Sequence, residues 1–321
     1  MSGESVVLAV DLGGSSMKGA VVTEHGETVA AERRPTPATG IVAALIELLL
    51  ELEATALELG HTVIAAAVVT PGIVEESSGI VRYASNLNWR DVPLLELLGV
   101  RFEFPITVGH DVRAAGLAER LLGAARGSDE FVLVPIGTGV AAALVTRGDT
   151  VTGASGAAGE FGHIPVVPGG ELCTCGQLGC LEVYVSGAGL ARRYAALGDA
   201  GLGGPALSSS EIVELVGSDP VADEVWADAV RVLAQGLAIM TLLLDPAVIV
   251  IGGGFAQAGD VLLSPVRAAL AEGLAWRDAP EVLLSTVGTD AGRIGAAILA
   301  FQVAGRGSVV NGWPAASAVA A

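Results

Sequence analysis

Residues 6–22 read VVLAVDLGGSSMKGAVV, an apolar run that is broken by a glycine-rich turn and then resumes. Aliphatic, valine-rich runs bounded by glycine are typical of strands, so this stretch predicts a strand, a turn and a second strand. Residues 130–147, EFVLVPIGTGVAAALVTR, repeat the pattern. The repetition indicates two similar halves, each opening on a strand–turn–strand loop.

Strand-like and helical stretches alternate along the rest of the chain. We expect helices at 40–59, 112–125, 260–272 and 290–303 and over much of 187–244, and strands at 61–72, 104–111 and 247–254. This alternation predicts the α/β class. A length of 321 residues suits two domains of ordinary size.

The composition narrows the class of protein. The formal charge is −18, which gives no basic footprint for nucleic acid, so no nucleic-acid partner is expected. We identify no apolar stretch of the roughly 18–20 residues that span a bilayer, and no basic segment that opens a signal peptide. The sequence therefore predicts a cytoplasmic protein without a membrane partner.

Three strands end in glycines, whose backbone N–H groups can turn toward an anion without obstruction by a Cβ atom. Each turn alone is compatible with an ordinary hairpin, whereas three in one chain favour a bound nucleotide. The candidate residues are Asp11, Gly13, Gly14, Ser15, Ser16 and Lys18 in the first loop, Gly137, Thr138 and Gly139 in the second, and Gly252, Gly253 and Gly254 in the third.

The pair His110-Asp111 stands between the strand at 104–111 and the helix that follows it. The simpler interpretation of Asp111 is the N-cap of that helix, a position that aspartate favours. The functional interpretation is a carboxylate that accepts a proton from a substrate hydroxyl.

All three cysteines lie within eight residues, in CTCGQLGC, and His163 precedes them, which gives His-x9-Cys173-x-Cys175-x4-Cys180. Three thiolates and one imidazole form the tetrahedral set that Zn²⁺ prefers, and four protein ligands make a structural site. A disulfide between Cys173 and Cys175 would be strained, and the Cys-x-x-Cys redox spacing is absent. Glu160 and Glu182 flank the site; each alone is compatible with a solvated surface charge, whereas a zinc loop that holds both could direct them at sugar hydroxyls.

Together these residues resemble the ROK family (repressors, open reading frames and sugar kinases). The stretch from Glu160-Phe161-Gly162-His163 to Cys180-Leu181-Glu182 is similar to the family's zinc and sugar signature. The glycine loops, Pro71-Gly72 and Asn86-Leu87-Asn88-Trp89 follow in the family's order. The resemblance covers about residues 6–299.

The resemblance implies a two-domain, actin-like ATPase (ribonuclease H-like) fold with a deep interdomain cleft and a structural zinc loop. A small α/β domain would span 1–115 and be completed by the helix at 290–303. A larger domain, 116–289, would carry the zinc loop, the second phosphate loop and the adenosine loop. Residues 307–321 are expected to form a flexible tail.

The resemblance also implies an ATP-dependent kinase that phosphorylates the 6-hydroxyl of glucose or N-acetylglucosamine, as a homodimer or tetramer. Asp111 would be the general base, and Asp11 would help to organise Mg²⁺ through water. The sugar would bind to Asn86, His110, Asp111, Glu160, His163 and Glu182, with His163 also on zinc. Two residues depart from the family pattern: His110 replaces the usual Asn, and Ala141 replaces a frequent Gly.

Other functions remain open at this stage. The substrate could be another hexose, such as N-acetylmannosamine, fructose or mannose, and the donor could be polyphosphate. A sugar-sensing repressor or a catalytically silent sugar-binding module is a further alternative. Family repressors carry an N-terminal helix-turn-helix region, whereas ten residues precede Asp11 here, and Asp11, Lys18 and Asp111 favour a kinase.

Overall fold

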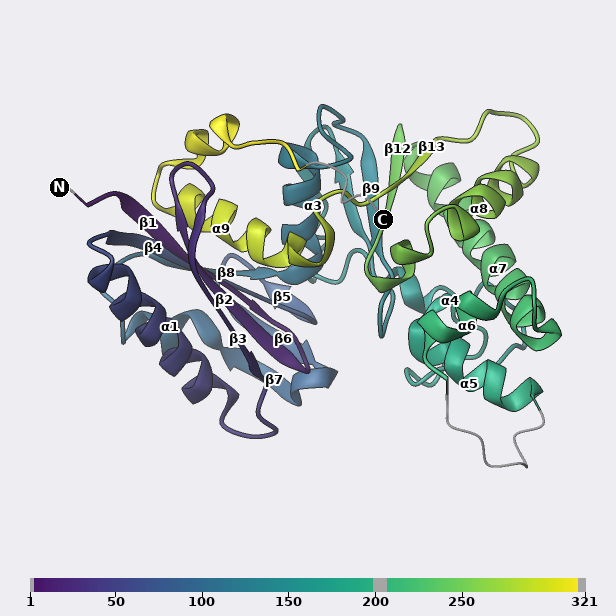
Figure 1. The fold of residues 1–321 in the computed structure, drawn as a ribbon, viewed down its shortest axis with the longest axis horizontal. Coiled ribbons are helices and arrows are strands. Elements are labelled where there is room, and N and C mark those ends of the chain that lie inside the picture. The colour runs from purple at the N-terminus through teal and green to yellow at the C-terminus, as the bar shows by residue number, and fades with distance from the viewer. Residues whose placement is uncertain (1–2, 199–206, 317–321) are drawn as a thin grey trace. The chain divides into compact units, whose positions relative to one another are not determined.

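The computed structural model describes residues 3–198 and 207–316 (Figure 1). The chain divides into two compact units. Within the described residues, unit 1 contains 3–127, 150–158 and 290–316, and unit 2 contains 128–149, 159–198 and 207–289. The boundary expected at residue 115 falls inside helix α3 (Asp111–Leu122), which lies wholly in unit 1.

Unit 1 is built on a five-stranded sheet in the order β3-β2-β1-β4-β8. The strands are β1 (Ser5–Leu12), β2 (Ser16–Thr23), β3 (Thr28–Pro35), β4 (Thr62–Thr70) and β8 (Ile106–His110), and the main helices are α1 (Ile41–Glu58), α3 and α9 (Ala291–Val303). β1, β4 and β8 run parallel, so their carboxyl ends meet at one edge of the sheet. β2 and β3 continue the sheet in antiparallel hairpins.

The alternation of side chains along β1 explains how this sheet is covered. Val6, Leu8, Val10 and Leu12 share a buried cluster with the leucines of α1. Since successive strand residues face opposite sides, Asp11 points to the other face, where Gly292 of α9 lies close to its carboxylate. The sheet is thus covered on both faces, and Asp11 is placed under α9.

A second, three-stranded antiparallel sheet in unit 1 was not predicted. It consists of β5 (Ile73–Glu75), β6 (Ile80–Ala84) and β7 (Trp89–Pro93), followed by the short helix α2 (Leu94–Gly99). The 3-10 helix η1 (Ser85–Leu87) carries Asn86 between β6 and β7. These strands have three to five residues, too few for a period of two to stand out in the sequence.

Unit 2 repeats the strand order of the first sheet, as β11-β10-β9-β12-β13. Its strands are β9 (Phe131–Pro135), β10 (Ala143–Thr146), β11 (Asp149–Thr150), β12 (Val248–Gly252) and β13 (Glu281–Leu284). Its helices are η2 (Phe161–His163), α4 (Leu181–Val185), α5 (Gly187–Leu197), α6 (Ser209–Leu215), α7 (Pro220–Leu244), η4 (Gly254–Ala258) and α8 (Asp260–Glu272), and η5 (Gly288–Asp290) leads out of the unit. The matching strand order supports the internal repetition seen in the sequence. The expected glycine-rich loop at 197–207 lies mostly outside the described residues.

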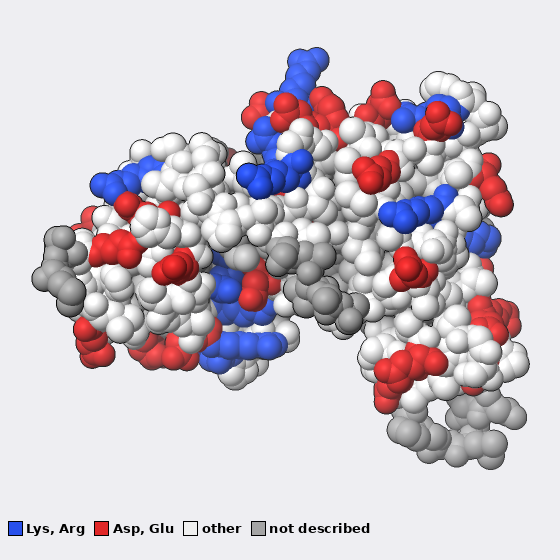
Figure 2. All heavy atoms as spheres, turned by 45° about the horizontal axis from the view of Figure 1, so that its top comes forward, with Lys and Arg blue, Asp and Glu red and all other residues white. Residues whose placement is uncertain are grey.

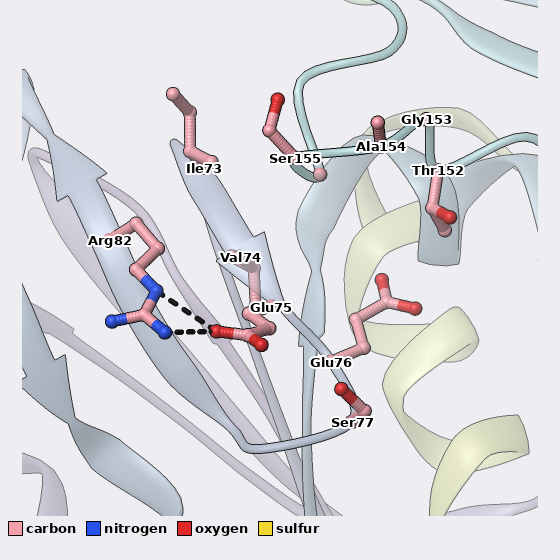
Figure 3. A pocket seen from close by; sticks show the side chains of 11 residues that line it. Ile73, Val74, Glu75, Glu76, Ser77, Arg82, Thr152, Gly153, Ala154 and Ser155 are labelled. Atoms are coloured by element: carbon pink, nitrogen blue, oxygen red, sulfur yellow. Dashed lines mark hydrogen bonds and ion pairs between the residues drawn. The ribbon is translucent and has the colours of Figure 1, made fainter.

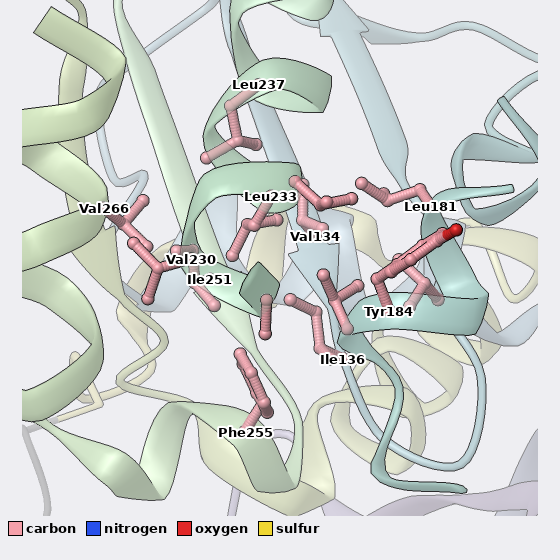
Figure 4. Packing of buried hydrophobic residues seen from close by; sticks show 14 of the residues in the cluster. Val134, Ile136, Leu181, Tyr184, Val230, Leu233, Leu237, Ile251, Phe255 and Val266 are labelled. Atoms are coloured by element: carbon pink, nitrogen blue, oxygen red, sulfur yellow. The ribbon is translucent and has the colours of Figure 1, made fainter. Parts of the chain in front are cut away.

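The core of unit 2 forms between β9, β12 and α7, where Val134, Ile251 and Leu233 pack together (Figure 4). Among the described residues α7 is the one helix long and apolar enough to cross a membrane by length and composition. The expectation that no stretch reaches that length is therefore wrong. Half of its most apolar window is buried inside the structure, as in a core helix.

Residues 307–316 differ from the flexible tail expected from residue 307. They form the 3-10 helix η6 (Gly307–Gly312) and an anchor at Trp313. The Trp313 ring packs edge-on against Phe301 of α9, and its indole N–H donates to the Glu24 carbonyl over 2.8 Å. Burial of an apolar side chain thus fixes a segment whose sequence shows neither a helical nor a strand periodicity. Residues 317–321 lie outside the described residues.

Charged side chains on the face drawn in Figure 2 are mixed in sign. Basic residues stand there singly or in small groups, with acidic residues nearby. The described residues of this face therefore show no extended patch of basic residues.

Candidate active site

The first glycine loop, residues 11–18, comprises the end of β1, the turn at 13–15 and the start of β2 in unit 1. The Gly13 N–H donates to the Ser16 carbonyl over 2.9 Å and closes a tight turn. A Cβ atom on Gly14 would lie 2.9 Å from the Cβ of Asn86, closer than side chains approach one another. Gly14 is thus needed where the loop meets Asn86, so two predicted site residues lie in contact.

Asp11 and Asp111 form an electrostatically coupled pair at the carboxyl-end edge of the first sheet. Burial raises the pKa of each carboxyl from 3.8 to about 6. The charge of Asp111 raises the pKa of Asp11 further, while Lys18 acts in the opposite direction. Each group can therefore exchange a proton close to neutral pH, which an ordinary surface aspartate cannot.

The N-terminus of α9 completes the surroundings of Asp11, a role that sequence reasoning missed. A Cβ atom on Gly292 would lie 3.0 Å from a carboxylate oxygen of Asp11. Asp290 lies 3.8 Å from the Lys18 ammonium and 3.1 Å from the Arg293 guanidinium. Gly292, the third residue of the helix predicted at 290–303, was the available signal for such a close approach.

Asp111 opens helix α3, but the residue that caps the helix is His110. The Nδ1 atom of His110 accepts the N–H groups of Val112, at 3.2 Å, and Arg113, at 3.3 Å. Burial lowers the pKa of His110 to about 3, and the charge of Arg113 adds to this, so the ring is neutral. Since Nδ1 accepts, the ring proton lies on Nε2. Asp111 is therefore the first residue of the helix and not its N-cap, although its Oδ1 atom also accepts the Val112 N–H, over 2.7 Å.

The second glycine loop, residues 137–139, follows β9 in unit 2 and is held by Glu182. The Oε2 atom of Glu182 accepts the Val140 N–H over 2.9 Å. A Cβ atom on Gly139 would lie 2.8 Å from the same oxygen. Glu182, expected from the sequence only beside the sugar, thus also shapes this loop.

The third glycine run packs against the second loop. Gly253 follows β12 with φ of 76°, and a Cβ atom there would lie 2.3 Å from the Ile136 carbonyl oxygen. Only glycine tolerates both the left-handed backbone and this approach.

Gly253→Ala is expected to lower the free energy of unfolding by about 3 kcal/mol or more, because backbone strain and a steric clash add. Gly254→Ala is the matched control: a Cβ atom there meets nothing within 4 Å, and a change below about 1 kcal/mol is expected. Thermal or denaturant unfolding measures both. Equal stability of the two variants would contradict the close approach.

The predicted metal ligands gather in unit 2. The ligand atoms of His163, Cys173, Cys175 and Cys180 all lie within 4.8 Å of one another. The Cys175 and Cys180 sulfurs are 3.6 Å apart, and Cys173 Sγ lies 3.8 Å from His163 Nδ1. Two ligands about 2.3 Å from a tetrahedral zinc ion would be about 3.8 Å apart, so the donor set and its spacing fit Zn²⁺.

The same histidine connects this cluster to Glu160. Nδ1 of His163 faces the sulfurs, and Nε2 lies 3.9 Å from Glu160 Oε2. Both side chains are partly exposed, so their outer atoms are accessible to a ligand. A metal on Nδ1 would fix the ring and present Nε2–H beside a carboxylate, a pairing suited to hydroxyl groups.

A cavity of about 670 Å³ lies in unit 1 between β5 and the segment 152–156 (Figure 3). Glu75 and Arg82 form an ion pair at one side of it, while Glu76 extends toward the opposite segment. The backbone N–H of His110 donates to Glu76 Oε1 over 3.3 Å. The cavity wall is therefore joined directly to the residue before Asp111.

The predicted site residues fall into one group in each unit. Unit 1 holds Asp11, Gly13, Gly14, Ser15, Ser16, Lys18, Asn86, His110 and Asp111. Unit 2 holds Gly137, Thr138, Gly139, Glu160, His163, Cys173, Cys175, Cys180, Glu182, Gly252, Gly253 and Gly254. Each group combines a glycine loop with polar side chains.

The chain is similar in sequence and in structure to known sugar kinases. The chain is 32% identical over 316 residues to a glucokinase of Streptomyces coelicolor, covering 92% of this chain and 97% of the relative. It is similar to the crystal structure of a ROK family glucokinase from Streptomyces griseus in complex with glucose and AMPPNP, with a TM-score of 0.80, 33% identity, and coverage of 92% and 99%.

A second structural neighbour is a ROK family transcriptional regulator, a homologue of the E. coli MLC protein. Its TM-score is 0.85 at 26% identity, covering 96% of this chain and 81% of the regulator. These likenesses confirm the predicted α/β fold of the actin-like ATPase class. Residues 7–303 match the sequence model of the ROK family. The chain therefore belongs to the ROK family.

Proposed function

We propose that the protein is an ATP-dependent hexose kinase that transfers the γ-phosphate of ATP to the 6-hydroxyl of glucose or N-acetylglucosamine. The observation that carries the proposal is Asp111, the first residue of α3, whose carboxyl accepts the Val112 N–H over 2.7 Å and has a pKa raised by burial to about 6. A general base works best when its pKa is close to the working pH. The glucokinase relative and the glucose-bound neighbour support the same reaction.

In the proposed reaction Asp111 accepts the proton of the sugar's 6-hydroxyl as the oxygen attacks the γ-phosphorus. The pKa of Asp11 is raised by burial and by the charge of Asp111, so a cation at this position would favour its ionised form, and that carboxylate would hold the water shell of Mg²⁺. When bound, Mg²⁺ neutralises charge on the phosphates. Lys18 and the glycine loops bind and orient the phosphates through ammonium and backbone N–H groups. Positioning and charge then supply most of the rate.

The remaining sugar hydroxyls are assigned to Asn86, His110, Glu160, His163 and Glu182. His110 is neutral and carries its proton on Nε2, so that atom can only donate. The family's usual Asn offers both a donor and an acceptor. With His110 this position offers the sugar a hydrogen-bond donor only. A matching substrate presents an acceptor oxygen there.

The substrate is tested by coupled ADP release with glucose, N-acetylglucosamine, N-acetylmannosamine, mannose and fructose, each with ATP and with polyphosphate as donor. We expect turnover with ATP and with glucose or N-acetylglucosamine, and product analysis should find the 6-phosphate. Purified protein that turns over none of these sugars would overturn the proposal. Preference for polyphosphate would correct the donor only.

The alternative function is a sugar-sensing regulator, which the structural neighbour of that class favours. A regulator of this kind would bind sugar without transferring phosphate. Calorimetry with the same sugars, beside the turnover assay, separates the two functions. The expected homodimer or tetramer, the cytoplasmic location and the lack of nucleic-acid binding stay predictions.

A further inference from the structure

Arg113 is an almost fully buried cation two residues after Asp111, with 4% of its side chain exposed. Its guanidinium donates to three acceptors: Glu76 Oε1 at 2.8 Å, the Gly156 carbonyl at 3.1 Å and the Val74 carbonyl at 3.2 Å. Two of these come from the β5 region and one from the segment 152–156. A planar guanidinium fork suits three acceptors in fixed directions, which a lysine ammonium cannot match.

Stability alone does not explain a buried charge at this position. The Arg113 guanidinium has lost most of its hydration, whereas the Glu76 side chain is 39% exposed, and burying a charge is expensive unless it is paired and hydrogen-bonded. The contribution of the Arg113–Glu76 pair is therefore a fixed geometry of the groups that it joins. Its position in the first turn of α3 connects it to Asp111.

Glu76 binds the residue that precedes Asp111 as well as Arg113, which follows it. Its Oε1 atom accepts both the Arg113 Nε–H and the backbone N–H of His110. His110 in turn caps the helix through the N–H groups of Val112 and Arg113. The residue before Asp111 and the second residue after it are therefore held by one carboxylate oxygen.

The three acceptors also belong to one cavity. Val74, Glu76 and Gly156 all line the cavity of about 670 Å³ shown in Figure 3. Arg113 is hydrogen-bonded to both walls of this cavity, through the carbonyls of Val74 and Gly156. The segment 152–156 leads along the chain to Glu160, four residues beyond Gly156.

We propose that Arg113 and Glu76 are positioning residues that fix the first turn of α3, and with it the carboxylate of Asp111, against β5 and the segment 152–156. The proposal rests on the proposed kinase function. A misplacement of about 1 Å can reduce a rate by about 10²-fold, so we expect loss of the pair to lower kcat more than it weakens sugar binding.

The first test compares Arg113→Met and Arg113→Lys with the wild-type protein. We expect kcat to fall by about 10- to 100-fold in Arg113→Met and by less in Arg113→Lys, with the sugar Kd changed less than about threefold. Arg82→Met is the matched control, an arginine of the same cavity that pairs with Glu75 and Asp91. A folded Arg113→Met protein with kcat within twofold of wild type would overturn the proposal.

The second test uses Glu76, because the arginine variants could simply fold poorly. Glu76→Gln keeps an acceptor oxygen and should retain more kcat than Glu76→Ala, which keeps none. The double variant Arg113→Met/Glu76→Ala should be about as slow as either single variant, since both remove one arrangement. Multiplying effects would show two independent roles and overturn the proposal.

A readout independent of turnover separates this proposal from the kinase assignment. Amide hydrogen exchange over residues 110–113 should become faster in Arg113→Met and Glu76→Ala and stay unchanged in Arg82→Met. If wild-type protein phosphorylates no sugar, the proposed function fails, and the exchange pattern still decides whether Arg113 fixes this turn. Unchanged exchange in all variants would overturn the positioning role.

Discussion

Asp111→Asn is expected to lose turnover and to become more stable than the wild-type protein at neutral pH. Removal of a general base lowers kcat by on the order of 10³-fold. Stability rises because burial raises the pKa of this carboxyl from 3.8 to about 6. At pH 7 the folded state must hold a charge that burial disfavours, and asparagine has none to hold.

The sign of the effect follows from proton linkage. Folded Asp111 binds a proton more tightly than the unfolded chain does, so the charge penalty is present above the folded pKa and fades as pH falls toward 3.8. A quarter of the side chain is exposed, which reduces the penalty to about 2 kcal/mol at pH 7. The advantage of Asp111→Asn should roughly halve between pH 7 and pH 5.

Coupled ADP release, sugar calorimetry and unfolding at several pH values measure these effects. Asp219→Asn is the control, since Asp219 caps α7 by accepting the Val221 and Ala222 N–H groups. The Ala222 N–H and the Tyr194 hydroxyl, which also donates to Asp219, hold the pKa of this carboxyl below the usual range, so Asp219→Asn should lose stability at neutral pH and keep turnover. Near-normal turnover in Asp111→Asn would remove Asp111 from the role of base.

Cys175→Ser is expected to abolish zinc binding and, with it, most of the sugar affinity. Cys175 is exposed, whereas Cys173 and Cys180 are buried, so this substitution removes a ligand without opening a core cavity. Without the metal nothing would fix Nδ1 of His163, and the Nε2 atom beside Glu160 would lose its orientation. We expect sugar affinity to fall by about tenfold or more.

Elemental analysis should find one zinc ion per wild-type chain and almost none in Cys175→Ser. Gln177→Ala is the matched control, because Gln177 lies in the same turn and its amide contacts the Cys175 sulfur without being a ligand candidate. That variant should keep its zinc. A native protein without metal that binds sugar with full affinity would refute the structural role of the cluster.

Local patterns predicted much of this molecule. The repeated strand–turn–strand stretches correspond to β1–β2 and β9–β10, because buried strands and glycine turns leave a signal within a few residues. The spacing from His163 to Cys180 was sufficient to predict the ligand cluster, since ligand chemistry leaves few alternatives.

Contacts between distant residues were not predictable in this way. Arg113 reaches Val74 and Gly156, 39 and 43 positions away, and no local period reports such pairing. The cap at His110 was missed because histidine is not among the usual capping residues. The contact of Glu182 with Val140 spans 42 positions, and like the Arg113 contacts it leaves no local pattern in the sequence.

Unit 1 is built from segments that lie far apart in the chain, and α9 packs against β1 within it. A ribosome releases Asp11 and Asp111 long before Ala291 emerges, and unit 2 is made in between. Until α9 has been made, the Asp11 carboxylate lacks the helix that packs against it in the folded unit. Folding of the proposed catalytic half therefore requires residues 291–303 as well as 5–122, two segments that lie on either side of unit 2 along the chain.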